Sequence, residues 1–133
     1  MKYLKLFENY KKTSVEDITN NLKDICQELN DNYIRTECYY NNPYVVNSKY
    51  QPGFMTVDME KMESENQYLD ALSWGEISET IDRIIDYMKS ENWKLSTLLI
   101  DGDELINPEQ WIENLRNKEH YSFTGLTINF IEN

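Results

Sequence analysis

The fold is decided by residues 73–101, which read SWGEISETIDRIIDYMKSENWKLSTLLID. Apolar side chains recur at helical spacing in the first half of this stretch, with charged side chains between them, which predicts an amphipathic helix. Ser73, followed by Glu76, is a capping-box signature at the start of that helix. Asn92 suits the left-handed conformation in which many helices end. The predicted apolar stripe consists of Trp74, Ile77, Ile81, Ile84, Ile85 and Met88.

A strand is predicted directly after this helix. Residues 95–100 form a short run that is apolar at both odd and even positions, with Leu95 and Leu99 on one side and Leu98 and Ile100 on the other. Such a run is typical of a strand covered on both faces, so we expect a central strand.

The first half of the chain repeats this plan. Ser14 and Asp17 form a second capping box, and apolar residues between positions 15 and 29 step by three and four. Two strands are predicted next, at 33–40 and 54–60, joined as an antiparallel hairpin by a long loop at 41–53. Adding 59 to the positions of the first helix places its caps and core residues on those of the second. An internal repeat explains this match, and so does the shared geometry of capped amphipathic helices.

The last third of the chain carries turn and cap signals. Asp101-Gly102-Asp103 predicts a turn, and Asn107-Pro108 with Gln110 predicts a capped short helix. The final strand, residues 121–131, changes its inward parity near Gly125, so we expect a β-bulge there. Residues 61–72 are polar and acidic and are expected to connect the hairpin to the second helix.

Together these elements predict a single α+β domain over residues 1–133. The domain would have two layers: a mainly antiparallel sheet of about four strands, and two long helices on one face of it. Residues 1–12 are either an edge strand or a flexible lead-in. If residues 3–7 form a strand, the first hundred residues follow a ferredoxin-like β-α-β-β-α-β path.

The composition limits the classes of partner that this chain is expected to bind. The net charge of -11 opposes direct binding to nucleic-acid phosphates and to anionic membranes. The chain has neither a secretory signal pattern nor a long apolar run, so we expect a cytoplasmic protein without membrane contact. Cys26 and Cys38 are expected to be buried thiols in a reducing compartment rather than a disulfide or a metal pair.

The candidates for catalysis are few. His120 is the only histidine, and the sequence contains neither a nucleophile motif nor a glycine-rich phosphate loop. The best oxygen-ligand cluster is Asp101, Asp103 and Glu104, which would suit a magnesium-dependent enzyme; a solvated turn before a helix explains the same residues. No cofactor is predicted.

The least ordinary composition lies between residues 39 and 54. Tyrosine offers a large amphipathic contact area at low entropic cost, and asparagine and serine add adaptable hydrogen bonds, so this segment is predicted to bind a protein partner. Alternatively, its tyrosines fold over the sheet, or they stack on single-stranded bases, for which Lys49 alone supplies positive charge. The candidate partner-binding residues are Tyr39, Tyr40, Tyr44, Tyr50 and Phe54.

The opening MKYLKLFENYKK and the helical LKDICQEL at residues 22–29 resemble the starts of small uncharacterised proteins of large tailed bacteriophages. The resemblance implies a viral protein that acts in the host cytoplasm as an accessory or anti-host factor. The expected function is therefore a small, acidic, non-catalytic protein-binding factor, for instance an inhibitor that occupies a basic groove of a host protein. The alternatives are the metal-dependent enzyme and a structural or homo-oligomeric phage component.

Overall fold

The computed structural model describes residues 12–61 and 71–133. Its helices are α2 (Val15–Asp31), α3 (Trp74–Ser90) and α4 (Pro108–Leu115). Its strands are β1 (Ile34–Asn41), β2 (Tyr44–Val46), β3 (Lys49–Gln51), β4 (Phe54–Lys61), β5 (Leu72–Ser73), β6 (Trp93–Ile100), β7 (Asp103–Glu104), β8 (Ser122–Phe123) and β9 (Gly125–Glu132). Residues 3–7 and most of the predicted 61–72 connection lie outside the described residues. The lead-in strand and the ferredoxin-like path therefore stay predictions.

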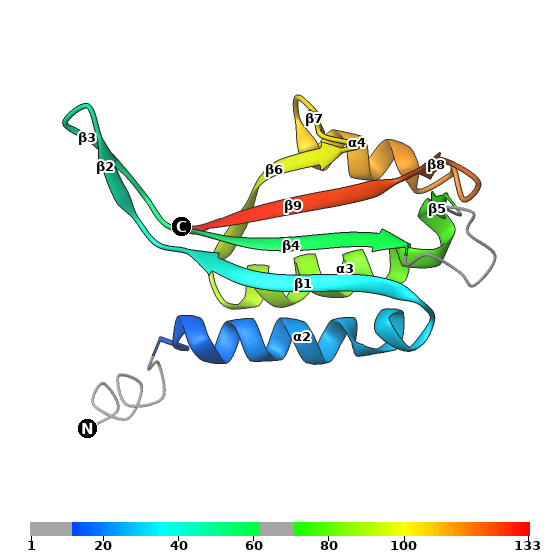
Figure 1. The fold of residues 1–133 in the computed structure, drawn as a ribbon, viewed down its shortest axis with the longest axis horizontal. Coiled ribbons are helices and arrows are strands. Elements are labelled where there is room, and N and C mark those ends of the chain that lie inside the picture. The colour runs from blue at the N-terminus through cyan, green and yellow to red at the C-terminus, as the bar shows by residue number, and fades with distance from the viewer. Residues whose placement is uncertain (1–11, 62–70) are drawn as a thin grey trace, which may run out of the picture.

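The main sheet has five antiparallel strands in the order β1-β4-β9-β6-β7. Helices α2 and α3 lie side by side on one face of it (Figure 1). The predicted two-layer α+β architecture is thus confirmed. The strand predicted at 95–100 lies inside the sheet, as β6 between β9 and β7. The middle strand is β9, and β7 covers only Leu99 and Ile100 of β6.

The arrangement of the two halves is symmetrical. Each long helix is followed by two long strands, β1 and β4 after α2, and β6 and β9 after α3. The second strand of each half, β4 and β9, pair with each other in the middle of the sheet. This is the order that a helix-strand-strand repeat would give, with β2 and β3 added to the first half and β5, β7, β8 and α4 added to the second.

The two predicted capping boxes differ in outcome. Ser14 Oγ accepts the Asp17 N–H at 3.1 Å and begins α2 as expected. Ser73 precedes α3, but its side chain makes no cap bond. The reason is that carbonyls from a distant segment take the first-turn donors: Trp74 N–H donates to Tyr121 O at 2.8 Å and Gly75 N–H to Glu119 O at 3.0 Å. Asn92, with φ 66°, follows α3 in the expected left-handed conformation.

The short helix α4 begins as predicted but without a capping box. Pro108 occupies its first turn, while Asn107 has φ 57° and no side-chain cap bond. The Gln110 amide donates to Asn114 Oδ1 instead of to the cap. Ile112 and Leu115 of α4 are buried in the core.

The predicted bulge at Gly125 was also wrong. The run from 121 to 131 is divided between β8, which pairs with β5, and β9, which joins the main sheet. The change of parity marks the boundary between these two strands. An irregularity of register lies instead in β6, between Leu95 and Thr97 opposite β9.

The core lies between the sheet and the helices. Alternate residues of the strands point into it, as do the predicted stripes of α2 and α3, in which Val15, Ile25 and Ile85 are only partly buried. The helices contribute Ile18, Leu22, Cys26, Leu29, Trp74, Ile77, Ile81, Ile84, Met88, Ile112 and Leu115. The strands contribute Ile34, Cys38, Met55, Val57, Met59, Leu72, Trp93, Leu98, Ile100, Phe123, Leu126, Ile128 and Phe130.

Candidate functional site

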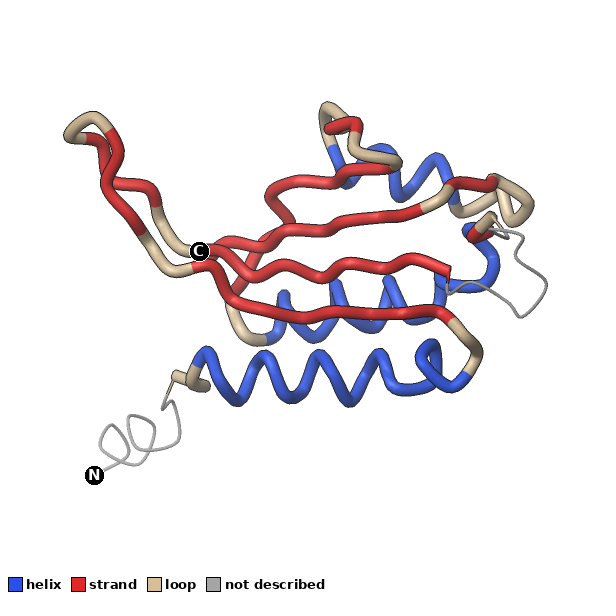
Figure 2. The backbone as a smooth tube through the Cα atoms, in the orientation of Figure 1, coloured by secondary structure: helices blue, strands red, loops and turns tan. Residues whose placement is uncertain are grey.

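A two-stranded arm projects from the body of the protein. The segment predicted as a loop at 41–53 contains β2 and β3, which pair antiparallel and extend beyond the end of the main sheet (Figures 1 and 2). The turn between them consists of Asn47 and Ser48, with φ 52° and 62°. Two successive left-handed residues suit a two-residue hairpin turn, whose twist matches that of the strands.

The side chains of this arm are exposed on both of its faces. Opposite residues on paired strands share a face, so Val45 pairs with Tyr50 on one side, while Tyr44 and Val46 lie on the other. All six residues of β2 and β3 are exposed, Val45 at 67% and Tyr50 at 68%. In the described part of the chain, these four side chains form the densest group of exposed large apolar residues.

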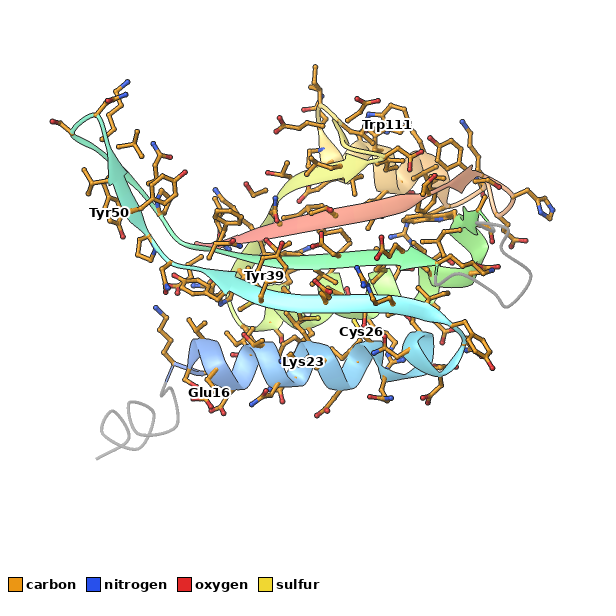
Figure 3. All side chains as sticks on the ribbon, viewed as in Figure 1. Glu16, Lys23, Cys26, Tyr39, Tyr50 and Trp111 are labelled. Atoms are coloured by element: carbon orange, nitrogen blue, oxygen red, sulfur yellow. The ribbon has the colours of Figure 1, made fainter. Side chains whose placement is uncertain are left out.

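The structure separates the predicted partner-binding residues. Tyr44 and Tyr50 lie on the arm, and Phe54 is half-buried at its base. Tyr39 lies exposed on β1, as Figure 3 shows together with Tyr50. Tyr40 instead packs against the core, with its ring edge-on to Trp93 at a centroid distance of 6.3 Å.

Val45 and Val46 were not among the predicted site residues. The signal for them was present in the sequence: Tyr-Val-Val and Lys-Tyr-Gln are two short groups of strand-favouring residues, separated by the two residues Asn47 and Ser48. Without glycine in the turn, this hairpin pattern is weaker than the Asn-Gly or Asp-Gly signals.

The face of the main sheet opposite the helices is polar and hydrogen-bonded. In β4, Thr56 and Asp58 alternate with the buried Met55, Val57 and Met59, so they point to this outer face. Thr56 Oγ1 accepts from Asn41 Nδ2 at 2.8 Å and donates to Asn129 Oδ1 at 2.7 Å. These bonds run across three strands and fix the side chains on this part of the outer face.

A second set of bonds on the outer face centres on Asp58. Its carboxylate accepts the Tyr39 hydroxyl at 3.1 Å and the Thr127 hydroxyl at 2.6 Å. Partial burial, the hydrogen bond to Asp58 and the negative charge of that carboxylate raise the pKa of Tyr39. Tyr39 is thereby held in its neutral, hydrogen-bond-donating form.

A shallow hollow connects the arm to the outer face. It has a volume of 260 Å³, and its lining joins Tyr44 and Gln51 of the arm to outer-face residues of three strands. The arm and the sheet therefore form one concave surface. The outer-face part of the lining comprises Phe54, Ser96, Thr97, Asn129 and Ile131, with Pro52 at the base of the arm.

The candidate metal residues lie around a turn. Asp101 Oδ1 accepts the backbone N–H groups of Thr124, at 2.7 Å, and Gly125, at 3.0 Å, which ties the end of β6 to the start of β9. Asp103 and Glu104 are exposed neighbours in β7, so their side chains point to opposite sides. Within residues 12–61 and 71–133, no group of three or more metal-ligating side chains is brought together.

The helical layer carries an acidic outer surface. Helix α2 has five acidic residues and one basic residue, and α3 has four acidic and two basic residues. Most of these side chains are exposed, because the opposite sides of both helices face the core. The arm, in contrast, has Lys49 as its one charged residue. The acidic and the apolar surfaces are thus separate.

The chain was compared with family models, with curated proteins and with solved structures, and none of them matches. Among the described residues, the helices are too short or too polar to cross a membrane. His120 is exposed and lies in the turn before β8.

Proposed function

We propose that this chain is a protein-binding module and that the β2–β3 arm is its main contact. The observation that carries the proposal is the exposure of Tyr44, Val45, Val46 and Tyr50 on both faces of a projecting ribbon. Water contact with such side chains is unfavourable, and burying them in a partner would stabilise the complex by roughly 25 cal/mol per Å² of apolar area.

The architecture of the arm supports the same proposal. An isolated two-stranded ribbon is marginally stable in water. In the described part of the chain, β2 and β3 pair only with each other, so each has a free edge. A partner that packs on the ribbon, or adds a strand to one of its edges, would supply the missing contacts. An apolar cleft or an exposed strand of another protein fits these requirements.

The acidic surface of α2 and α3 would add a second contribution to binding, because it attracts a partner with basic residues. Complementary charge accelerates association and makes it sensitive to salt. An accessory factor that inhibits a host protein by covering a basic groove is one form that this module would take. In that form, a rise from about 50 to about 500 mM salt lowers the association rate by at least about tenfold. If the association rate did not depend on salt, the acidic surface would not contribute, and the apolar arm alone would make the contact.

The experiment uses two matched variants. Tyr44→Ser with Tyr50→Ser removes both aromatic rings of the arm, and Tyr33→Ser removes an equally exposed ring from the turn before β1. Wild type and both variants, each checked for folding by circular dichroism, are used to capture proteins from cells of the source organism. The captured protein is then purified, and its affinity for each form is measured by calorimetry.

We expect the arm variant to bind its partner at least about 100-fold more weakly than wild type, because buried tyrosines commonly contribute about 2 kcal/mol or more each to such contacts. The Tyr33 variant should bind like wild type. Equal affinity of wild type and the arm variant would contradict the proposed role of the arm.

A further inference from the structure

Two cysteines from different elements meet inside the protein. Cys26, labelled in Figure 3, lies on the side of α2 that faces the sheet. Cys38 lies in the edge strand β1. Their Sγ atoms are 4.0 Å apart, and both thiols are free and buried. They are the only cysteines of the chain.

The connection between α2 and β1, which lies between the two cysteines in the sequence, is held by its own hydrogen bonds. Asn30 Oδ1, in the last turn of α2, accepts both the N–H and the hydroxyl of Thr36, each at 3.0 Å. This bond pair sets the register of β1 against the end of α2. The contact between Cys26 and Cys38 is therefore a product of the local fold rather than of a mobile loop.

We propose that Cys26 and Cys38 form a redox-active dithiol, which a small neutral hydroperoxide converts into an intrachain disulfide. The sulfur atoms have to approach each other by about 2 Å, since a disulfide bond is about 2.05 Å long. Rotation of the two side chains about χ1, with a small shift of α2 toward β1, would have to supply a movement of this size. The product would join α2 covalently to the edge of the sheet.

The reaction balances with hydrogen peroxide as the oxidant. The Cys26 thiolate attacks one peroxide oxygen, the O–O bond breaks, and the released hydroxide takes a proton to become water, which leaves a sulfenic acid on Cys26. The Cys38 sulfur, on losing its proton, attacks the Cys26 sulfur and displaces the hydroxyl group as a second water. The two thiols together lose two electrons and two protons, and the peroxide accepts them.

The order of attack follows from the thiol–thiol hydrogen bond. Either thiol can donate in this contact. With Cys38 as the donor, the bond lowers the pKa of Cys26, which Thr36 and the charge of Arg83 lower further, while the same bond and burial raise the pKa of Cys38. Cys26 is thus the sulfur that becomes a thiolate first. Because the site is buried in a protein of net charge -11, a small uncharged oxidant reaches it more readily than a bulky anionic disulfide such as oxidised glutathione.

The test follows intact mass and thermal stability of the full chain. Reduced wild-type protein is treated with hydrogen peroxide, the reaction is quenched with acid, and the intact mass is measured by mass spectrometry. We expect the monomer to lose about 2 Da and both free thiols. The melting temperature should rise by about 5 °C or more, because the bond closes a short loop in the unfolded chain, and dithiothreitol should reverse the change.

Single variants assign the two roles. In Cys38→Ser the sulfenic acid has no partner, so the mass should increase by about 16 or 32 Da. In Cys26→Ser the remaining thiol should react at least about tenfold more slowly than wild type. The proposal is overturned if folded wild type gains oxygen without losing about 2 Da, forms disulfide-linked dimers, or stays reduced under conditions that oxidise the urea-unfolded chain. These mass measurements on wild type decide the question even if a serine variant fails to fold.

Discussion

Val45 and Tyr50 lie directly opposite each other across the β2–β3 ribbon, and both side chains remain largely exposed. A cross-strand pair of an aromatic and a β-branched residue contributes roughly 0.2–1 kcal/mol to a ribbon. That contribution is small compared with the entropy of ordering the six strand residues, which is about 1–2 kcal/mol per residue for the backbone alone. The order of the free arm therefore depends strongly on its turn.

Replacing Ser48 with glycine should make the arm more rigid. Ser48 has φ 62°, a conformation that glycine adopts without the steric strain of a Cβ atom, and glycine directly after Asn47 would give the most favoured two-residue hairpin turn. We expect Ser48→Gly to slow amide hydrogen exchange in β2 and β3 by about threefold to tenfold, as measured by NMR. Exchange in β4 and β9 serves as the internal control. Faster exchange in the arm would show that the turn has another conformation.

A methyl group at Gly53 should disturb the base of the arm. A Cβ atom at this position would lie 1.9 Å from the Tyr40 hydroxyl and 2.8 Å from the Asn41 carbonyl oxygen. Tyr40 packs edge-on against Trp93, so a shift of its hydroxyl end away from residue 53 would disturb that contact. We expect Gly53→Ala to lower the free energy of unfolding by about 1–3 kcal/mol in urea titrations.

Gly102→Ala provides the comparison for Gly53. At Gly102, nothing lies within 4 Å of an added Cβ, but φ is +83°. Its effect should be limited to backbone strain, about 1 kcal/mol, with no change around Tyr40. A larger loss at Gly102 than at Gly53 would contradict the steric argument.

How far the sequence predicts this fold is shown by Ser14 and Ser73. Both precede an apolar stripe and have an acidic residue three positions later, yet only Ser14 caps its helix with its side chain. At Ser73 the decisive partners are the carbonyls of Glu119 and Tyr121, which lie far away in sequence. Local sequence patterns identify the helices and their buried faces. They do not reveal where a distant segment of the chain replaces a side-chain cap at the end of a helix.

The candidate site was predictable to a similar extent. Composition drew attention to the segment around Tyr44 and Tyr50, because tyrosine is common in binding surfaces. It did not separate these residues from Tyr40, whose inward direction depends on its register in β1 and on the position of Trp93 in β6. The division of residues 121–131 into β8 and β9 also depends on a distant element, because β8 pairs with β5. The sequence pattern of this run alone therefore does not predict it.

Asp101 should act as a structural clamp. Its carboxylate accepts two backbone N–H groups at the start of β9, and hydrogen bonds to a charged group are worth about 1.5–3 kcal/mol. Asp101→Ala should therefore reduce the free energy of unfolding by about 1–3 kcal/mol. Asp101→Asn keeps an acceptor oxygen and suits the left-handed φ of 53°, so it should lose less than half as much.

A metal titration separates this clamp from the alternative metal site. If Asp101, Asp103 and Glu104 bound magnesium, adding the ion would raise the melting temperature of wild type and not that of Asp103→Asn with Glu104→Gln. We expect equal melting curves with and without magnesium in both proteins. A shift confined to wild type would favour the metal-dependent alternative.

Tyr39 should make the protein less stable at alkaline pH. Its pKa is raised in the folded state, so between the ordinary tyrosine pKa of about 10 and the folded value the native protein binds more protons than the unfolded chain. The contribution of Tyr39 to the free energy of unfolding is therefore fully present below about pH 10. It is lost as pH rises through the folded pKa, because the ionised Tyr39 then faces the Asp58 carboxylate. Tyr39→Phe removes this contribution.

Urea titrations from about pH 8 to about pH 11 should show a shallower loss of stability in Tyr39→Phe than in wild type, and Tyr33→Phe should follow wild type. Parallel curves for all three proteins would mean that the bond to Asp58 is not maintained in solution.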